Sequence, residues 1–592
     1  MNGPSSVEKA IANTQRIVET FERRLRLFVP LALLALCLVV YLPGILRLPA
    51  VDRTEIVYAE STRDMVARGN WLDPRYGDVV HKFRPIGTYW AQGVAAAFAG
   101  EAHARDIWVY RLPGLIAVTL SVLALFWLAA PVIGPGEALI ASGLFAVAPL
   151  TVLLAQLAIT EGLALLPATV AMLCLLRIYL SEPGADTRRF ATLLWAAVGF
   201  GILLNALQLP ILIAATLIAL YILDRDLSWL KNTHPLYSVP LVLFIAHPWL
   251  VVRAHQDGVP FAGMPWGDFL DALGGSQDMK LKAWPGTFLV ATALGFLPGT
   301  ALIIPALMKL WDERTQRLAR FLFAWVVGYL IYLEAISGKP GTYAVQVMFP
   351  ALAIAVAMLI ERHVFPAGHP VVPLKWSLIP WPPLAASFGL SLFVVPYMIM
   401  REAPPVWIAL PVAAITVLFY WSAHEGRLGH LIRWAAIGIA ALGLTAVTMY
   451  AGVLPAIDRI WPARQIQRAM EGCPAGPISV LGYREPSSKF LLQSDSRLVE
   501  PEALRTALVE GRTLYLVGEA RDPRLMAMNR FQFRRPRMLG CVEAYNVVRG
   551  CKLYFRLAAT GDISNCKLPV LFACNEAFNN AAIQARENKA CD

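Results

Sequence analysis

Long apolar runs recur along this chain and constrain its fold more than any other feature. About thirteen of them are long enough to cross the roughly 30 Å of hydrocarbon in a bilayer as helices. Only 16% of the residues are charged, against about 25% in soluble domains. We therefore expect an α-helical polytopic membrane protein. The runs lie at residues 28–48, 108–131, 135–152, 157–180, 190–205, 207–223, 237–253, 285–308, 320–337, 343–361, 377–400, 404–421 and 431–453.

The basic residues predict how the chain is oriented. Arg23, Arg24 and Arg26 precede the first run, which places residues 1–27 in the cytoplasm under the positive-inside rule. An odd number of spans then puts the C-terminus outside. The first run lacks a convincing cleavage site, so we interpret it as an uncleaved helix. The net charge of +11 is scattered over short loops, which fits topology better than nucleic-acid binding.

The polar segment 49–107 separates the first two runs of the expected 28–453 membrane module. Its apolar residues recur at helical spacing and predict two amphipathic helices lying along the membrane interface. The turn into the second helix contains Lys82, Phe83, Arg84 and Pro85.

Residues 457–592 differ from the rest of the chain in their hydrophobic pattern. They contain no spanning run, and short strand-like segments at 478–481, 513–517 and 552–557 accompany a helix-like one at 501–510. We expect a small α/β domain on the outer, periplasmic face.

Cysteine usage supports an oxidising compartment for this tail. Six of the eight cysteines fall there, enough for up to three disulfides whose pairing the sequence leaves open. A zinc site is the weaker alternative, because the tail has no Cys-x-x-Cys pair and no histidine. The six are Cys473, Cys541, Cys551, Cys566, Cys574 and Cys591.

Acids and bases gather at the predicted outer ends of the spans. Carboxylates at this depth suit proton acceptance from a hydroxyl or phosphate, and cations suit a lipid-linked phosphate. Together they favour glycosyl transfer from a polyprenyl-phosphate sugar, whose tail stays in the bilayer. These acids and bases include Asp52, Glu55, Lys82, Arg84, Glu161 and Lys339, and the neutral amide Asn205 lies among them.

Several short motifs carry a family resemblance. Glu55 is followed by Tyr58-Ala59-Glu60, Arg84-Pro85 precedes Tyr89-Trp90, and Thr160-Glu161 and Lys339-Pro340 come later. Their order resembles the GT-C membrane glycosyltransferases, especially the bacterial relatives of protein O-mannosyltransferases that include the lipid A aminoarabinose transferase. Thr54 and Phe83 stand where that family typically has acids.

The resemblance implies a GT-C fold and an inverting glycosyltransferase of the bacterial inner membrane. The implied donor is a polyprenyl-phosphate sugar, and the implied acceptor is a glycolipid such as lipid A or, alternatively, a secreted protein. A divalent metal is left open and no other cofactor is expected. The implied roles are base or acceptor orientation for Glu55, Asp52 and Glu161, donor-phosphate binding for Arg84, Lys339 and Lys82, and substrate binding for Tyr58, Tyr343 and Asn205.

Two other classes of function remain open. A transporter of lipid-linked sugars predicts charges buried in mid-span and interrupted helices related by a repeat, and neither pattern is evident in the sequence. A catalytically silent envelope scaffold is the other alternative, which the replaced family acids leave open.

Overall fold

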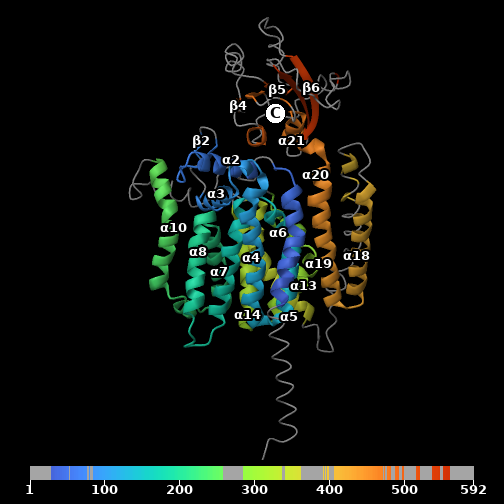
Figure 1. Ribbon diagram of the computed structural model, residues 1–592. Coiled ribbons are helices and arrows are strands. Elements are labelled where there is room, and N and C mark those ends of the chain that lie inside the picture. Colours follow the sequence, from blue (N-terminus) through green and yellow to red (C-terminus); the bar gives the residue numbers. More distant parts are fainter. Residues whose placement is uncertain are drawn as a thin grey trace, which may run out of the picture.

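The computed structural model shows a bundle of helices with a small β-sheet at one end (Figure 1). It describes residues 28–51, 54–76, 79–80, 85–257, 284–336, 341–361 and 406–470, and parts of 391–398 and 473–580. We call the end of the bundle that faces the sheet the sheet end, and the opposite end the far end.

Within the described part, seven helices are long and apolar enough to cross a membrane, or nine if each of two bent pairs is one span. The polytopic membrane class is therefore confirmed. The count of thirteen stays a prediction, because most of 377–400 lies outside the described residues. The seven are Phe28–Arg47, α4 (Ile107–Ile133), α7 (Thr160–Tyr179), α14 (Arg317–Ala335), Thr342–Ile360 with α15 (Phe349–Glu361), Val406–Arg427 with α18 (Ala409–Arg427), and Leu431–Ala456 with α19 (Leu431–Val447).

Three further apolar helices complete the bundle. They correspond to the predicted runs at 190–205, 207–223 and 237–253. Figure 1 shows α8 between α7 and α10, and α9 packs against α14 and α8. They are α8 (Arg188–Asn205), α9 (Gln208–Asp224) and α10 (Pro235–Asp257).

Two of the predicted runs are interrupted helices in the structure, a feature that was not evident in the sequence. α5 (Pro135–Val147) and α6 (Pro149–Ala155) meet at 64°, and α12 (Thr287–Gly295) and the segment Gly299–Asp312, which contains α13 (Ile303–Asp312), meet at 118°. A proline lies in each break and lacks the N–H that would continue the helix. The apolar composition runs through both breaks, which explains why hydropathy alone missed them.

Two short helices lie across the sheet end of the bundle, at the positions predicted for the amphipathic pair. α2 (Thr54–Ala67) and α3 (Gly87–Ala99) flank the antiparallel strands β1 (Arg75–Tyr76) and β2 (Val79–Val80). The side chains of Ile56, Ala59 and Met65 on α2 are buried in protein, whereas Phe98 on α3 is 89% exposed. Both helices exist, and their location at a membrane interface stays a prediction.

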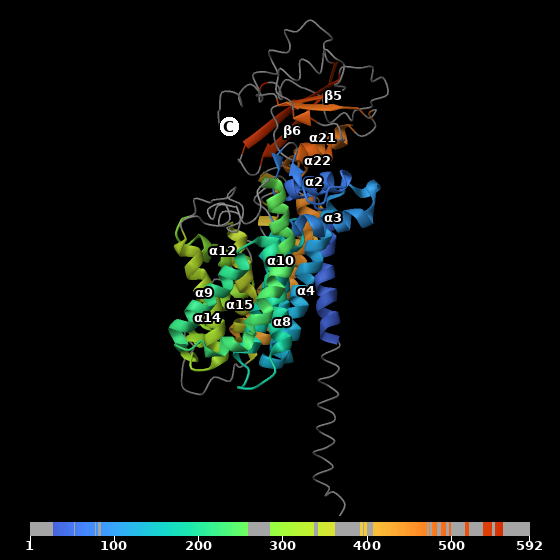
Figure 2. The same ribbon diagram turned by 90° about the vertical axis from the view of Figure 1, so that its left-hand side faces the viewer.

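The tail forms a five-stranded mixed sheet above α2 and α3 (Figure 2). β3 is parallel to β4 and β5, and β7 is antiparallel to β5 and β6. The three strand-like segments read from the sequence correspond to β3, β5 and β7, and the helix expected at 501–510 lies outside the described residues. The strands are β3 (Ile478–Leu481), β4 (Arg497–Leu498), β5 (Tyr515–Glu519), β6 (Arg537–Asn546) and β7 (Cys551–Ala559).

The sheet region contacts the bundle through a short helix, α22 (Ser487–Leu491). The Arg105 guanidinium donates hydrogen bonds to the carbonyl oxygens of Phe490 and Leu492. The rings of Tyr110 and Phe490 meet edge to face, with centroids 5.8 Å apart. These contacts fix α22 against the start of α4.

The cysteines divide as the sequence indicated. Cys37 and Cys174, in helices of the bundle, are free and buried. Cys473 and Cys541, in the tail, are both disulfide-bonded.

Candidate functional site

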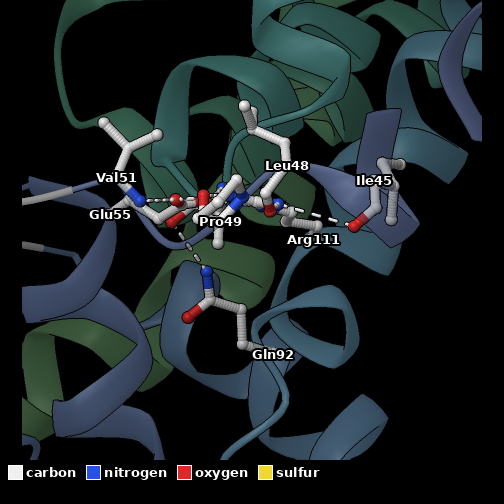
Figure 3. A network of polar contacts seen from close by, with 8 residues as sticks. Ile45, Leu48, Pro49, Val51, Glu55, Gln92 and Arg111 are labelled. Atoms are coloured by element: carbon white, nitrogen blue, oxygen red, sulfur yellow. Dashed lines mark hydrogen bonds and ion pairs between the residues drawn. The ribbon is translucent and has the colours of Figure 1, made fainter. Parts of the chain in front are cut away.

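A buried ion pair joins the start of α2 to the start of α4 at the sheet end (Figure 3). The Arg111 guanidinium donates to both carboxylate oxygens of Glu55, from Nε at 2.7 Å and from Nη2 at 2.7 Å. Glu55 is 1% exposed and Arg111 is 0% exposed. A bidentate pair removed from water in this way is strong only if the remaining donors and acceptors also find partners.

Arg111 uses its remaining donors on the end of the first helix. Its Nη1 donates to the carbonyl oxygens of Leu48, at 2.6 Å, and Ile45, at 3.5 Å, and Nη2 donates to that of Pro49, at 2.9 Å. The last carbonyls of a helix have no partner within it, and this guanidinium satisfies them. All five N–H groups of Arg111 are therefore engaged.

The hydrogen-bond acceptor positions of the Glu55 carboxylate are also all occupied. Besides the two guanidinium bonds, its oxygens accept from the backbone N–H groups of Val51 and Ala158, each at 2.8 Å. An ionised carboxylate has about four acceptor positions, so none is left for a substrate proton in this structure. The geometry gives Glu55 a positioning role, holding the loop after the first helix against α4 and the α6–α7 connection, and its expected role as base stays a prediction.

A chain of buried hydroxyls links α2, α3 and α7 beside this pair. The Thr160 hydroxyl donates to the Tyr58 hydroxyl at 2.7 Å, and the Thr160 and Thr88 hydroxyls are 2.9 Å apart. Tyr58 is only 5% exposed, and its ring centroid lies 5.2 Å from that of Tyr89. Tyr58 thus packs inside the protein, and its predicted contact with substrate stays a prediction.

Glu161 follows Thr160 in the first turn of α7 and is half-buried. Its charge acts on the phenol of Tyr343, which lies in η6 (Thr342–Met348). The fold therefore brings together two predicted site residues from distant parts of the chain. Asn205, a third, ends α8 and donates a hydrogen bond to Gln208.

The predicted donor-phosphate cations lie outside the described residues. These are Lys82, Arg84 and Lys339, and the predicted acid Asp52 lies outside them as well. Among the residues that the structure describes, no group of three or more His, Cys, Asp or Glu side chains is placed to hold a metal ion.

Arg111 and Thr88 are the residues that sequence reasoning left without a role. An arginine in the first turn of an apolar span is costly unless it is paired, and this signal could have identified Arg111. Thr88 carries no such signal, because a threonine in a helix is common.

Residues 84–252 match the family model of dolichyl-phosphate-mannose-protein mannosyltransferase. The match covers less than a third of the chain. It includes α3, α4, Glu161 and most of the helices that follow to α10.

Two similar proteins carry the name undecaprenyl phosphate-alpha-4-amino-4-deoxy-L-arabinose arabinosyl transferase. The protein from Erwinia tasmaniensis is 26% identical over 317 residues, 52% of this chain and 54% of its own length. The one from Edwardsiella ictaluri is 27% identical over 338 residues, 56% of this chain and 58% of its own length. The chain thus spans little more than half the length of these relatives.

Two crystal structures of ArnT from Cupriavidus metallidurans share the fold. The apo structure superposes with a TM-score of 0.69 over 93% of this chain and 98% of that one, at 18% identity. The structure bound to undecaprenyl phosphate gives 0.68 over 89% and 97%, also at 18% identity. The likeness includes the bundle and extends into the tail, since it covers nearly the whole chain.

Proposed function

We propose that this chain is a membrane glycosyltransferase of the GT-C type and that it transfers a sugar from a polyprenyl-phosphate donor to an envelope glycolipid such as lipid A. The reaction would take place at the sheet end, on the periplasmic face of the inner membrane, with inversion at the sugar. The observation that carries the proposal is the fold shared with ArnT bound to undecaprenyl phosphate over 89% of the chain.

The geometry of the sheet end supports the proposal in a second way. The charge of the half-buried Glu161 acts on the phenol of Tyr343, whose ring packs against the cluster that includes Ile159, just before α7. A carboxylate there is able to orient the acceptor hydroxyl or phosphate and to accept its proton. Glu161 therefore takes the acceptor-side role, and Glu55 holds the surrounding backbone through Arg111.

The donor side of the proposal rests on the sequence. Arg84, Lys339 and Lys82 would bind the donor phosphate, because cations at the membrane surface stabilise the charge that develops as it leaves. Asp52 would assist Glu161 as a second acid, with Tyr343 and Asn205 in contact with substrate. A divalent metal held at Glu161 would add a further charge to this site.

Two alternative functions, transfer to a protein and transport of the lipid-linked sugar, are each supported by a separate observation. The matching family model is described as a protein mannosyltransferase, which favours a secreted protein as acceptor. The two bent helix pairs are the kind of interruption expected in a transporter of lipid-linked sugars. Both alternatives are separated from the proposal by the identity of the product.

The test is transfer of labelled sugar from an undecaprenyl-phosphate donor to lipid A by the purified protein in liposomes. We expect Glu161→Gln to lower kcat about 100-fold, the usual contribution of a general base. The matched control is Glu101→Gln, an exposed acid in η1 (Glu101–His103) at the same end of the bundle.

Each outcome decides between the functions. Full activity in Glu161→Gln would reject its role, and Arg84→Ala tests the donor side in the same assay. Labelled protein in place of labelled lipid A would favour the protein acceptor. Movement of the donor across the bilayer without transfer would favour the transporter.

A further inference from the structure

Three arginines gather at the far end of the bundle, where α7 ends and α8 begins. Arg177 lies in the last turn of α7, and Arg188 and Arg189 open α8. Arg177 is half-buried, and the other two are exposed.

Two of these guanidinium groups share one aromatic ring. The guanidinium carbons of Arg177 and Arg189 lie 5.0 Å and 4.7 Å from the centroid of the Phe190 ring. Cation–π attraction holds each group near the ring. The two charges are also close enough to repel each other, and an anion between them would offset that repulsion. We call these three residues the Arg177–Phe190–Arg189 stack.

Within the described part of the chain, neither guanidinium of the stack forms an ion pair or donates a hydrogen bond. The acids of the adjoining loop are Glu182 and Asp186, both exposed. Asp186 accepts a bond at 3.0 Å from the backbone N–H of Arg188. The half-buried donors of Arg177 are thus open to an anion from outside the described residues, and such a partner would offset the cost of burying them.

The position of the stack along the bundle indicates what that partner is. α7 begins at Thr160, which contacts α2 and α3 at the sheet end. It is 20 residues long, which at 1.5 Å per residue amounts to about 30 Å, the thickness of the hydrocarbon. Arg177 lies within the last turn, so the stack is at the depth where lipid head groups begin.

We propose that the Arg177–Phe190–Arg189 stack binds the phosphate group of an anionic phospholipid such as phosphatidylglycerol. Guanidinium groups bind phosphate through two parallel N–H···O bonds, and basic pockets between spans are known to hold anionic head groups. The site lies at the opposite end from the proposed reaction, so it is independent of the proposed function.

The experiment is native mass spectrometry of the full-length protein in neutral detergent, titrated with phosphatidylglycerol or phosphatidylcholine. The wild type should retain phosphatidylglycerol in preference to phosphatidylcholine. The double variant Arg177→Ala/Arg189→Ala should bind it about thirtyfold more weakly, because two cations near the head group are lost.

Arg427→Ala is the matched control, since it removes an exposed arginine from the end of α18, also at the far end of the bundle. An equal loss of binding in this control would overturn the proposal, because the attraction would then be a property of the whole basic surface. Equal retention of the two lipids, or displacement of phosphatidylglycerol by inorganic phosphate alone, would also overturn it.

The double variant Arg177→Lys/Arg189→Lys keeps both positive charges. It replaces the alanine variant in the binding measurement if that variant unfolds. Lysine has no planar fork for bidentate contact. We expect binding about tenfold weaker than in the wild type, and unchanged binding would contradict the proposed geometry.

Discussion

At the sheet end of the bundle, Glu55 and Arg111 are buried and use every donor and acceptor within the protein. At the far end, Arg177 and Arg189 stack on Phe190 with no acceptor among the described residues. Both sets contain an arginine near the end of an apolar span. They differ in whether the protein or its surroundings supplies the anion.

The difference follows from what covers each end. α3 contacts α4, and side chains of α2, α3 and α22 share one buried cluster with the start of α4. A charge there leaves water and must be paired inside the protein. Among the described residues, the connections at the far end are short, so charges there meet water or lipid head groups. Substitutions at the sheet end should therefore change stability, whereas those at the far end should change it little.

Arg111→Met should have the largest effect. It leaves the buried Glu55 carboxylate without its cation, which costs about 3–5 kcal/mol. Thermal unfolding of the purified protein measures the loss. The double variant Glu55→Met/Arg111→Met should be more stable than Arg111→Met, because no unpaired charge remains. A single variant as stable as the wild type would refute the structural role of the pair.

Arg105→Ala should have the second-largest effect on stability. It removes a charged donor from the carbonyls of Phe490 and Leu492, at about 1.5–3 kcal/mol. Because those bonds hold α22, limited proteolysis should cleave the tail faster than in the wild type. Arg468→Ala is the control, since its exposed ion pair with Asp458 is worth about 0–1 kcal/mol. Equal cleavage of both variants would contradict the prediction.

Thr88→Val should cost about 1 kcal/mol, because it removes the hydroxyl that meets Thr160 while keeping a similar shape. Thr88→Ser keeps that hydroxyl and should restore most of the stability in the same thermal measurement. If serine destabilises as much as valine, packing rather than the hydroxyl chain is the important property of this position.

Asp226→Asn, at the far end, should have the smallest effect. The backbone N–H and the hydroxyl of Ser228 bond to the carboxylate, at 2.8 Å and 2.9 Å, and lower the pKa of Asp226. A carboxylate whose pKa is lower in the folded protein stabilises the fold at any pH above its unfolded pKa of about 3.9. This stabilisation is lost as the pH falls through the lower folded pKa. The two proteins should differ slightly near neutral pH and converge once the pH has fallen below the lowered folded pKa of Asp226. A difference that grows in acid would contradict this assignment.

The sequence predicted much of the fold and only part of the site. The run at 108–131 and the strand at 478–481 correspond closely to α4 and β3, because length and apolar pattern are local properties. Glu55 was selected correctly as an unusual residue, but its partner was not found. Glu161 and Tyr343 were each selected, and only the fold brings them together.

By itself, the sequence determined that this chain is a polytopic membrane protein with a disulfide-bearing tail and polar residues at the ends of its spans. Hydrophobic thickness acts on each run separately, so it can be read one segment at a time. Only the tertiary structure decided that Arg111 neutralises Glu55, 56 positions away, and that two runs bend. Those outcomes depend on which groups meet in space, because a buried charge takes whatever partner the packing brings within hydrogen-bonding distance.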